Sequence, residues 1–231
     1  MSVVVLDVET TALPGSKDYP ANYTDYSNRK DKIYFKGEVI QMTALVCSEE
    51  DLTIEKFISF YCMPSEPISE GAFNVHKISN SAVVDLSGGR PLEEYLTVDY
   101  KDVFYNQSNI YVGHNISFDS RVINNNLKDF WIEPIDFGNP VKSLVNKNKS
   151  CTYCTMQNAK RLMGLPKNPK LTELVDRLGY NEFIPEVGCT KLQFIVNGVC
   201  KNFNINNTGA FHNSDYDTIC TWIALNHLIK L

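Results

Sequence analysis

The sequence predicts an α/β domain in which helices flank a mixed β-sheet. Three segments near the N-terminus have the apolar, β-branched and aromatic composition of strands: residues 3–9, 38–47 and 53–62. Farther along the chain, a short apolar strand at 109–113 precedes a series of helical segments. Strands followed by an alternation of strands and helices are typical of an α/β or an α+β domain with a mixed sheet.

Length and composition indicate one soluble domain, which we place over residues 1–231. The chain is 43% hydrophobic and 21% charged, close to the average of globular proteins. No apolar run approaches the roughly 20 residues of a membrane-spanning helix, and no signal peptide is evident. The seven cysteines are too widely spread for the disulfide framework of a small secreted domain. We therefore expect a cytoplasmic protein with no membrane partner.

The order of the predicted elements follows from their local signals. The first three strands are expected to form an antiparallel meander, because the polar segment 48–51 suits a hairpin turn. Gly164 and Gly179 occupy positions typical of helix C-termini. Helices are predicted over 92–105, 118–127, 152–163, 171–178 and 215–230, the last with Ile219, Trp222, Ile223 and Ile229 on one face.

Two segments exceed what a minimal domain of this kind needs. Residues 14–36 are polar, rich in tyrosine and too long for an ordinary turn. Residues 181–210 contain the Asn197-Gly198 pair, a strong type I′ turn signal, so 192–205 is predicted as a hairpin. We interpret the two segments as an inserted loop after the first strand and an inserted β-hairpin before the last helix.

The charge is unevenly distributed. The whole chain carries −5, but residues 137–172 contain no acid and carry +7, which leaves −12 for the rest. Such a stretch is either a solvated basic face or a surface that follows nucleic-acid phosphates. The basic residues are Lys142, Lys147, Lys149, Lys160, Arg161, Lys167 and Lys170.

Asp7 and Glu9 end the first predicted strand. Residues two apart on a strand point to the same face, so both carboxylates project together. Neighbouring anions that are partly buried repel each other, and a hard divalent cation such as Mg²⁺ or Mn²⁺ removes that cost. The alternative is a frayed strand end with both acids hydrated.

Two further acids lie at predicted helix starts. Asp119 falls in the first turn of a helix after Gly113, where an acid also complements the helix dipole. Asp217 follows Ser214 by three residues, as in a capping box with Ser214 as the N-cap. His212 precedes Asp217 by five residues, and histidine is a natural proton acceptor as well as a common bystander.

Taken in order, these motifs resemble those of the DEDD 3′–5′ exonucleases of the ribonuclease H-like superfamily. The matching segments are Asp7-Val-Glu-Thr-Thr, Asn115-Ile-Ser-Phe-Asp119 and His212-Asn-Ser-Asp-Tyr-Asp217. The spacing of the last segment is similar to that of the DEDDh, or DnaQ-like, branch. Val75-His-Lys-Ile-Ser79 and the segment 171–178 also resemble family segments, so the likeness extends from Val3 to about Leu228.

The resemblance implies a metal-dependent reaction that releases nucleoside 5′-monophosphates from 3′ ends, most simply of single-stranded DNA. Asp7 would bridge two divalent ions about 4 Å apart. Glu9 and Asp217 would complete one site, and Asp119 would hold the second ion. His212 would act as the general base.

The resemblance also implies contacts with the terminal nucleotide by Thr10, Leu13, His76, Asn115 and Phe118. Three of these have a plain structural explanation as well: Phe118 as core, Asn115 as a helix cap and His76 as a loop residue. Family members usually carry glycine where this chain has Ala12. The Cys151-x-x-Cys154 pair is half a zinc site, but packing near a helix start is the preferred interpretation.

Several functions stay open at this point. An exonuclease that trims RNA would have the same motifs, because the contact that recognises the 2′-hydroxyl is not encoded in them. Tyrosines of the first insertion could stack on bases of either nucleic acid; they are Tyr19, Tyr23, Tyr26 and Tyr34. A non-catalytic nucleic-acid-binding module is another candidate function. So is a subunit of a polymerase or repair assembly, docked through the predicted 197–198 hairpin.

Overall fold

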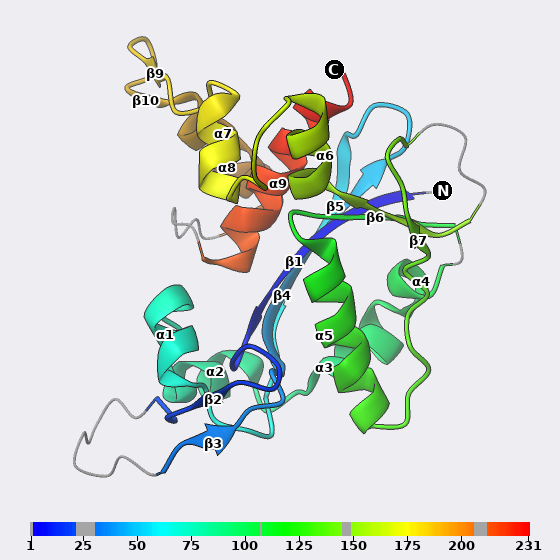
Figure 1. Ribbon diagram of the computed structural model, residues 1–231, viewed down its shortest axis with the longest axis vertical. Coiled ribbons are helices and arrows are strands. Elements are labelled where there is room, and N and C mark those ends of the chain that lie inside the picture. Colours follow the sequence, from blue (N-terminus) through cyan, green and yellow to red (C-terminus); the bar gives the residue numbers. More distant parts are fainter. Residues whose placement is uncertain (1, 22–30, 107, 145–148, 206–211) are drawn as a thin grey trace.

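The computed structural model describes residues 2–21, 31–106, 108–144, 149–205 and 212–231. Its centre is a six-stranded sheet in the order β5-β4-β1-β6-β8-β7 (Figure 1). β4 and β5 run antiparallel to their neighbours, and β6, β8 and β7 run parallel to β1. The strands are β1 Ser2–Thr10, β4 Val39–Ser48, β5 Ile54–Tyr61, β6 Ile110–Gly113, β7 Asn139–Pro140 and β8 Cys151–Cys154. The predicted mixed sheet and its N-terminal meander are confirmed.

Helices cover both faces of this sheet (Figure 1). A π-helical turn at Tyr95–Asp99 separates α3 from α4 within the predicted helix 92–105. The helices are α1 Glu70–His76, α2 Asn80–Ser87, α3 Leu92–Glu94, α4 Lys101–Phe104, α5 Ile116–Asp129, α6 Thr155–Leu162, α7 Leu171–Arg177, α8 Lys191–Phe203 and α9 Ser214–Leu228. No helix in the described ranges is long and apolar enough to cross a membrane.

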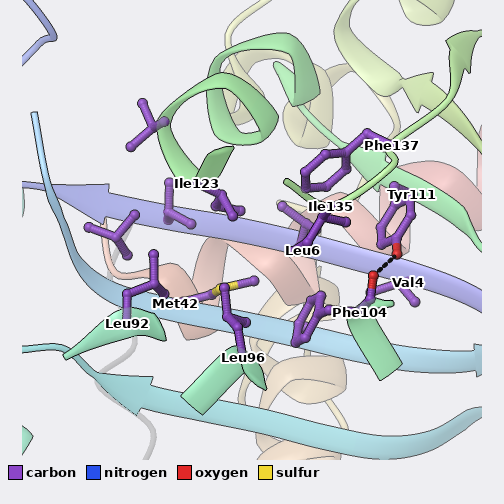
Figure 2. Close-up of a cluster of buried hydrophobic side chains, with 14 of the residues drawn as sticks. Val4, Leu6, Met42, Leu92, Leu96, Phe104, Tyr111, Ile123, Ile135 and Phe137 are labelled. Atoms are coloured by element: carbon purple, nitrogen blue, oxygen red, sulfur yellow. Dashed lines mark hydrogen bonds between the residues drawn. The ribbon is translucent and has the colours of Figure 1, made fainter. Parts of the chain in front are cut away.

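Alternation along β1 divides the core into two layers. Val4, Leu6 and Val8 pack with α3, α4 and α5 on one face of the sheet. Figure 2 shows this layer, in which the buried Tyr111 hydroxyl donates a hydrogen bond of 2.7 Å to the Phe104 carbonyl. Val3 and Val5 point to the other face, where they pack with α7, α8 and α9. Asp7 and Glu9 continue that second series, so they face the α9 side.

Residues 191–203 form helix α8, so the hairpin predicted over 192–205 with its Asn197-Gly198 turn is wrong. α8 buries Leu192, Val196, Val199 and Cys200, which recur at helical spacing and pack against the sheet. The burial of this stripe outweighs the local turn signal of two residues. The insertion 181–210 does contain a hairpin, but it is the short pair β9 Phe183–Ile184 and β10 Cys189–Thr190.

Other boundaries also differ from the predictions. Residues 151–154 form strand β8, so the helix predicted over 152–163 begins only at Thr155. Helices α1 and α2 follow the meander, where none was predicted. Ile219 and Ile223 of α9 are buried as expected, whereas Ile229 is 46% exposed, because it lies just past the helix end. Gly164 and Gly179 have φ of +64° and +76°, the left-handed values that end helices.

The first insertion is described only in part. It contains the two-residue strands β2 Lys17–Asp18 and β3 Ile33–Tyr34, which pair with each other. The rings of Tyr19 and Tyr34 each carry a lysine ammonium above them, at 5.2 and 5.3 Å. Tyr23 and Tyr26 lie outside the described residues, so their predicted stacking role stays a prediction.

A glycine substitution distinguishes helix from hairpin at α8. We expect Gly198→Ala to stabilise the protein by about 0.5–1 kcal/mol, because Gly198 is inside a helix and an added Cβ meets no atom within 4 Å. Gly188→Ala is the matched control, since Gly188 is equally unobstructed but has a φ of +69° and should destabilise. The measurement is urea unfolding. Destabilisation by Gly198→Ala would indicate a turn at this position.

Candidate functional site

Asp7 and Glu9 lie in the part of β1 that extends beyond its parallel neighbour β6. The parallel pairing of β1 with β6 covers Val3 to Val5, and β6 ends at Gly113. β1 continues to Thr10, so its last residues have no strand on that side. A register shift between Glu9 and Thr10 adds a local bend at the strand end. Both carboxylates therefore border an opening at the carboxyl end of a central strand.

The turn from β6 into α5 brings Asp119 to the same opening. An added Cβ on Gly113 would lie 3.1 Å from Ile116, which indicates how sharply the chain turns there. Asp119 lies in the first turn of α5, as predicted, and is only 4% exposed. Asp119 and Asp7 line the same cleft, and the charge of Asp119 contributes to the raised pKa of Asp7.

Asp217 reaches the opening because the start of α9 is tied to β4. The Thr43 hydroxyl donates to the Asp215 carboxylate at 2.5 Å and accepts from the Ser214 hydroxyl at 2.7 Å. The N-cap is Asn213, whose side chain accepts hydrogen bonds from the backbone N–H groups of Asp215 and Tyr216. The prediction of Ser214 as N-cap is wrong, because its hydroxyl is used in the contact with the sheet.

The acids converge in one cleft of about 540 Å³. Single oxygens of Asp7, Glu9 and Asp217 all lie within 4.8 Å of one another. Asp119 lines the same cleft, and so does His212, which precedes α9. The five residues predicted as catalytic thus come together from β1, α5 and the start of α9.

Burial and mutual repulsion favour the protonated carboxyl groups in the metal-free cleft. Burial raises the pKa of Glu9 to about 8, and the charges of Asp217 and Asp119 add to this effect. Burial likewise raises the pKa of Asp119 and of Asp217 to about 7 each. The pKa of Asp7 lies well above its usual value, first through burial and then through its three acidic neighbours. Bound cations would reverse this preference.

The arrangement fits hard divalent cations. Asp217 Oδ1 is buried without a hydrogen-bond partner among the described residues, although unpaired buried carboxylate oxygens are costly. The other oxygen, Oδ2, accepts a hydrogen bond of 3.1 Å from the His212 backbone N–H. An oxygen-only donor set is what Mg²⁺ and Mn²⁺ prefer. Asp7, Glu9, Asp119 and Asp217 are the residues that would hold them.

His212 stands at the edge of the cleft with an exposed side chain. Its φ of +67° is a left-handed conformation, which costs a non-glycine residue about 1–2 kcal/mol. The backbone hydrogen bond to Asp217 spans five residues and holds the histidine in this conformation. The sequence spacing that suggested a shared role therefore has a direct structural counterpart.

The residues predicted to bind the terminal nucleotide divide into two groups. Asn115 and Phe118 line the cleft; Asn115 occupies the N-cap position of α5 without a side-chain capping bond. Thr10, Leu13 and His76 lie outside the described lining of the cleft.

His76 is buried beneath the loop that follows β1. Its Nδ1 accepts a hydrogen bond from the Ile78 N–H, so Nε2 carries the proton and donates a hydrogen bond of 3.2 Å to the Thr10 carbonyl. Burial lowers the pKa of His76 to about 4, which keeps the ring neutral. Thr10 is buried with its hydroxyl bonded to the Ala12 carbonyl, whereas Leu13 is 68% exposed. The three contacts predicted for these residues stay predictions.

One wall of the cleft was not predicted. It consists of Met156 at the start of α6 together with residues 168–172, which lead into α7. The sequence offered a weak signal, since these residues run into the family-like segment 171–178 and include Lys170, with Lys167 just before them. The basic stretch 137–172 is otherwise divided: Lys142 and Arg161 line a different cavity, beside Val3 and Ile110 at the opposite strand ends.

Cys151 and Cys154 are packing residues in the described structure. Both are buried on β8 with their thiols in the two hydrophobic layers, and Cys154 is also the N-cap position of α6. This agrees with the preferred interpretation, that the pair packs near a helix start.

The fold and the acidic cleft are those expected of a nuclease, and comparison with known families gives the class of protein. Residues 4–224 match the family model RNase_T, described as exonuclease, and the chain belongs to this exonuclease family. The predicted exonuclease family is thereby confirmed. The assignment to the DEDDh branch and the 3′–5′ direction stay predictions. No curated protein matches the chain.

Solved exonucleases share the fold at low sequence identity. Exonuclease X, in complex with 5′-overhanging duplex DNA, has a TM-score of 0.57 at 19% identity, over 99% of this chain and 91% of that one. The nuclease domain of 3′hExo, a DEDDh family member bound to rAMP, has a TM-score of 0.59 at 12% identity, over 99% of this chain and 92% of that one. The E. coli ExoI–ssDNA complex has 0.59 at 14%, over 98% of this chain but only 40% of that one.

The raised pKa values give the metal-free protein a specific pH dependence. In EDTA the acids bind more protons in the folded than in the unfolded state. Their contribution to the free energy of unfolding is therefore greatest below about pH 4. It should fall as pH rises to about 8, the pKa of Glu9. Thermal unfolding should show this decline in EDTA and its reversal when Mg²⁺ or Mn²⁺ is added.

Asp7→Asn removes one of the four buried, mutually repelling acids, so it should stabilise the metal-free protein at pH 8. Asp85→Asn is the matched control, because Asp85 is an exposed acid of α2 away from the cleft, and it should leave the pH profile unchanged. A pH profile identical in the two variants would contradict the electrostatic coupling described here.

Proposed function

We propose that the protein degrades single-stranded DNA from its 3′ end and releases nucleoside 5′-monophosphates, with two divalent cations in the acidic cleft. The observation that carries the proposal is the convergence of four carboxylates from β1, α5 and α9 in a single cleft. Two divalent ions would balance the four negative charges that otherwise repel one another. Mg²⁺ or Mn²⁺ is the expected metal.

The residues of the cleft suit hydrolysis of a phosphodiester. Divalent cations held by the four carboxylates would supply Lewis-acid stabilisation of the negative charge that develops at the phosphorus. His212 would accept a proton from the attacking water. Its exposed side chain at the cleft edge supports this role. The water oxygen bonds to phosphorus and the bond from phosphorus to the 3′ oxygen of the shortened strand breaks. That oxygen takes up a proton and becomes the new 3′ hydroxyl, while the phosphate stays on the released nucleotide.

Single-stranded DNA is the first substrate to test. The E. coli ExoI structure contains single-stranded DNA, and the Exonuclease X structure contains duplex DNA with a 5′ overhang. The 3′hExo domain was solved with rAMP, which makes RNA the second candidate. The three complexes all contain nucleotides, so they support a nucleic-acid substrate but do not choose between the sugars.

One assay tests both metal and substrate. The protein is incubated with 5′-labelled single-stranded DNA, duplex DNA and RNA, each with Mg²⁺, Mn²⁺ or EDTA. We expect stepwise shortening of single-stranded DNA with either metal, none in EDTA, and mononucleotide 5′-phosphates as products. If only RNA is shortened, the substrate is RNA and the proposal of single-stranded DNA is wrong. Binding without shortening under every condition would contradict catalysis.

Single substitutions test the assigned residues. Asp217→Asn should abolish activity, because the cations lose a ligand. The fold should stay intact. His212→Gln should lower kcat by about 10²–10⁴-fold, the usual contribution of a general base. Asp85→Asn serves again as the exposed control and should keep full activity. Full nuclease activity in purified Asp217→Asn would refute the metal assignment.

A further inference from the structure

The cleft wall formed by residues 168–172 brings a positive charge to an acidic site. Lys170 is the only lysine or arginine among the described residues that line the cleft. Lys167, three residues earlier, lies 3.4 Å from the Glu173 carboxylate and forms an ion pair with it. Pro169 between them is buried, whereas Asn168 and Lys170 on either side of it are exposed. The loop is therefore anchored by its proline and presents its polar neighbours to the cleft.

His114 holds this loop through the Pro169 carbonyl. A carbonyl only accepts hydrogen bonds, so His114 Nε2 carries a proton and donates it at 3.0 Å. Nδ1 of the neutral ring is then an acceptor, and it lies 3.1 Å from the Thr155 hydroxyl at the start of α6. One imidazole thus joins the turn after β6, the start of α6 and the approach to α7. Burial lowers the pKa of His114, which favours this neutral form.

The two ends of the loop are fixed as well. The Leu165 N–H donates to the Lys160 carbonyl at 2.9 Å, which ties the beginning of the loop to α6. The Lys170 N–H donates to the Glu173 carboxylate at 3.2 Å, which ties its end to α7. With His114 in the middle, the backbone that carries Lys170 is held at both ends and at Pro169. Lys170 is thereby kept beside the cleft.

We propose that Lys170 binds a backbone phosphate of the bound strand and that His114 is the positioning residue that keeps Lys170 at the cleft. The inference rests on the proposed function and names its contact with the strand. Cations in the cleft offset the four carboxylates but leave no surplus charge for the neighbouring phosphates. An ammonium group on the facing wall supplies that charge, and it attracts phosphates regardless of base sequence.

The test compares the salt dependence of cleavage among lysine variants. We expect Lys170→Gln to raise KM about tenfold with little change in kcat, as for loss of one charged hydrogen bond. The slope of log KM against log salt concentration should fall by about 0.7, the value for one phosphate contact on a single strand. Lys101→Gln is the matched control, because Lys101 is an exposed lysine of α4 that does not line the cleft.

The positioning role of His114 is tested by comparing its variants with Lys170→Gln. His114→Leu should raise KM and lower the salt slope as Lys170→Gln does, and the double variant should be no worse than either single one. His114→Gln keeps an N–H donor near the Pro169 carbonyl and should restore most of the affinity. Melting temperatures of all variants show whether each is folded. A merely structural role would lower activity without changing the salt slope and without rescue by glutamine.

The outcomes separate this inference from the proposed function. If the wild type cleaves but Lys170→Gln keeps the wild-type KM and salt slope, the inference is wrong and the exonuclease proposal stands. If the wild type cleaves nothing, affinity for 5′-fluorescein oligothymidylate in Ca²⁺ is measured by fluorescence anisotropy for wild type, Lys170→Gln and Lys101→Gln. Selective loss of affinity in Lys170→Gln would support the phosphate contact, and equal affinity would overturn it.

Discussion

Electrostatic repulsion within one small cleft is the constraint around which this protein is built. Asp7, Glu9 and Asp217 each have an oxygen within 4.8 Å of the others, and Asp119 lines the same cleft. In water such a cluster would separate, because each added charge raises the energy of its neighbours. Here the four groups cannot separate, since the rigid core fixes the elements that carry them. The repulsion in the metal-free cleft is what favours the binding of divalent cations there.

The core provides that rigidity through differences in strand length. β6 ends at Gly113 while β1 continues to Thr10, so the carboxyl end of β1 has no parallel neighbour and borders the cleft. Apolar residues at alternate positions of β1 pack on both faces and hold the strand in register. Helix α9 lies across the same strands and is tied to Thr43 of β4 by side-chain hydrogen bonds. The cleft is thus bounded by elements that the hydrophobic core already holds in place.

The wall before α7 adds a positive charge to the acidic cleft, that of Lys170. Family membership fixes the class of reaction, and the acids account for cation binding, but an acidic cleft alone repels a polyanion. The hydrogen bonds of His114 connect this wall to the turn that carries Asp119. A single imidazole therefore connects the turn that leads to Asp119 with the wall that carries Lys170.

The sequence by itself predicted the meander and the α/β class, because the alternation of apolar residues along a strand is a local property. It also offered the five catalytic candidates, through the order and spacing of motifs that resemble those of an exonuclease family. The tertiary structure decided the rest. Packing against the sheet made residues 191–203 a helix despite Asn197-Gly198, since burial of four apolar side chains outweighs one turn signal. The contact with Thr43 made Asn213, and not Ser214, the cap of α9. The wall at Pro169 depends on His114, 55 residues away, and no local pattern encodes such a distance.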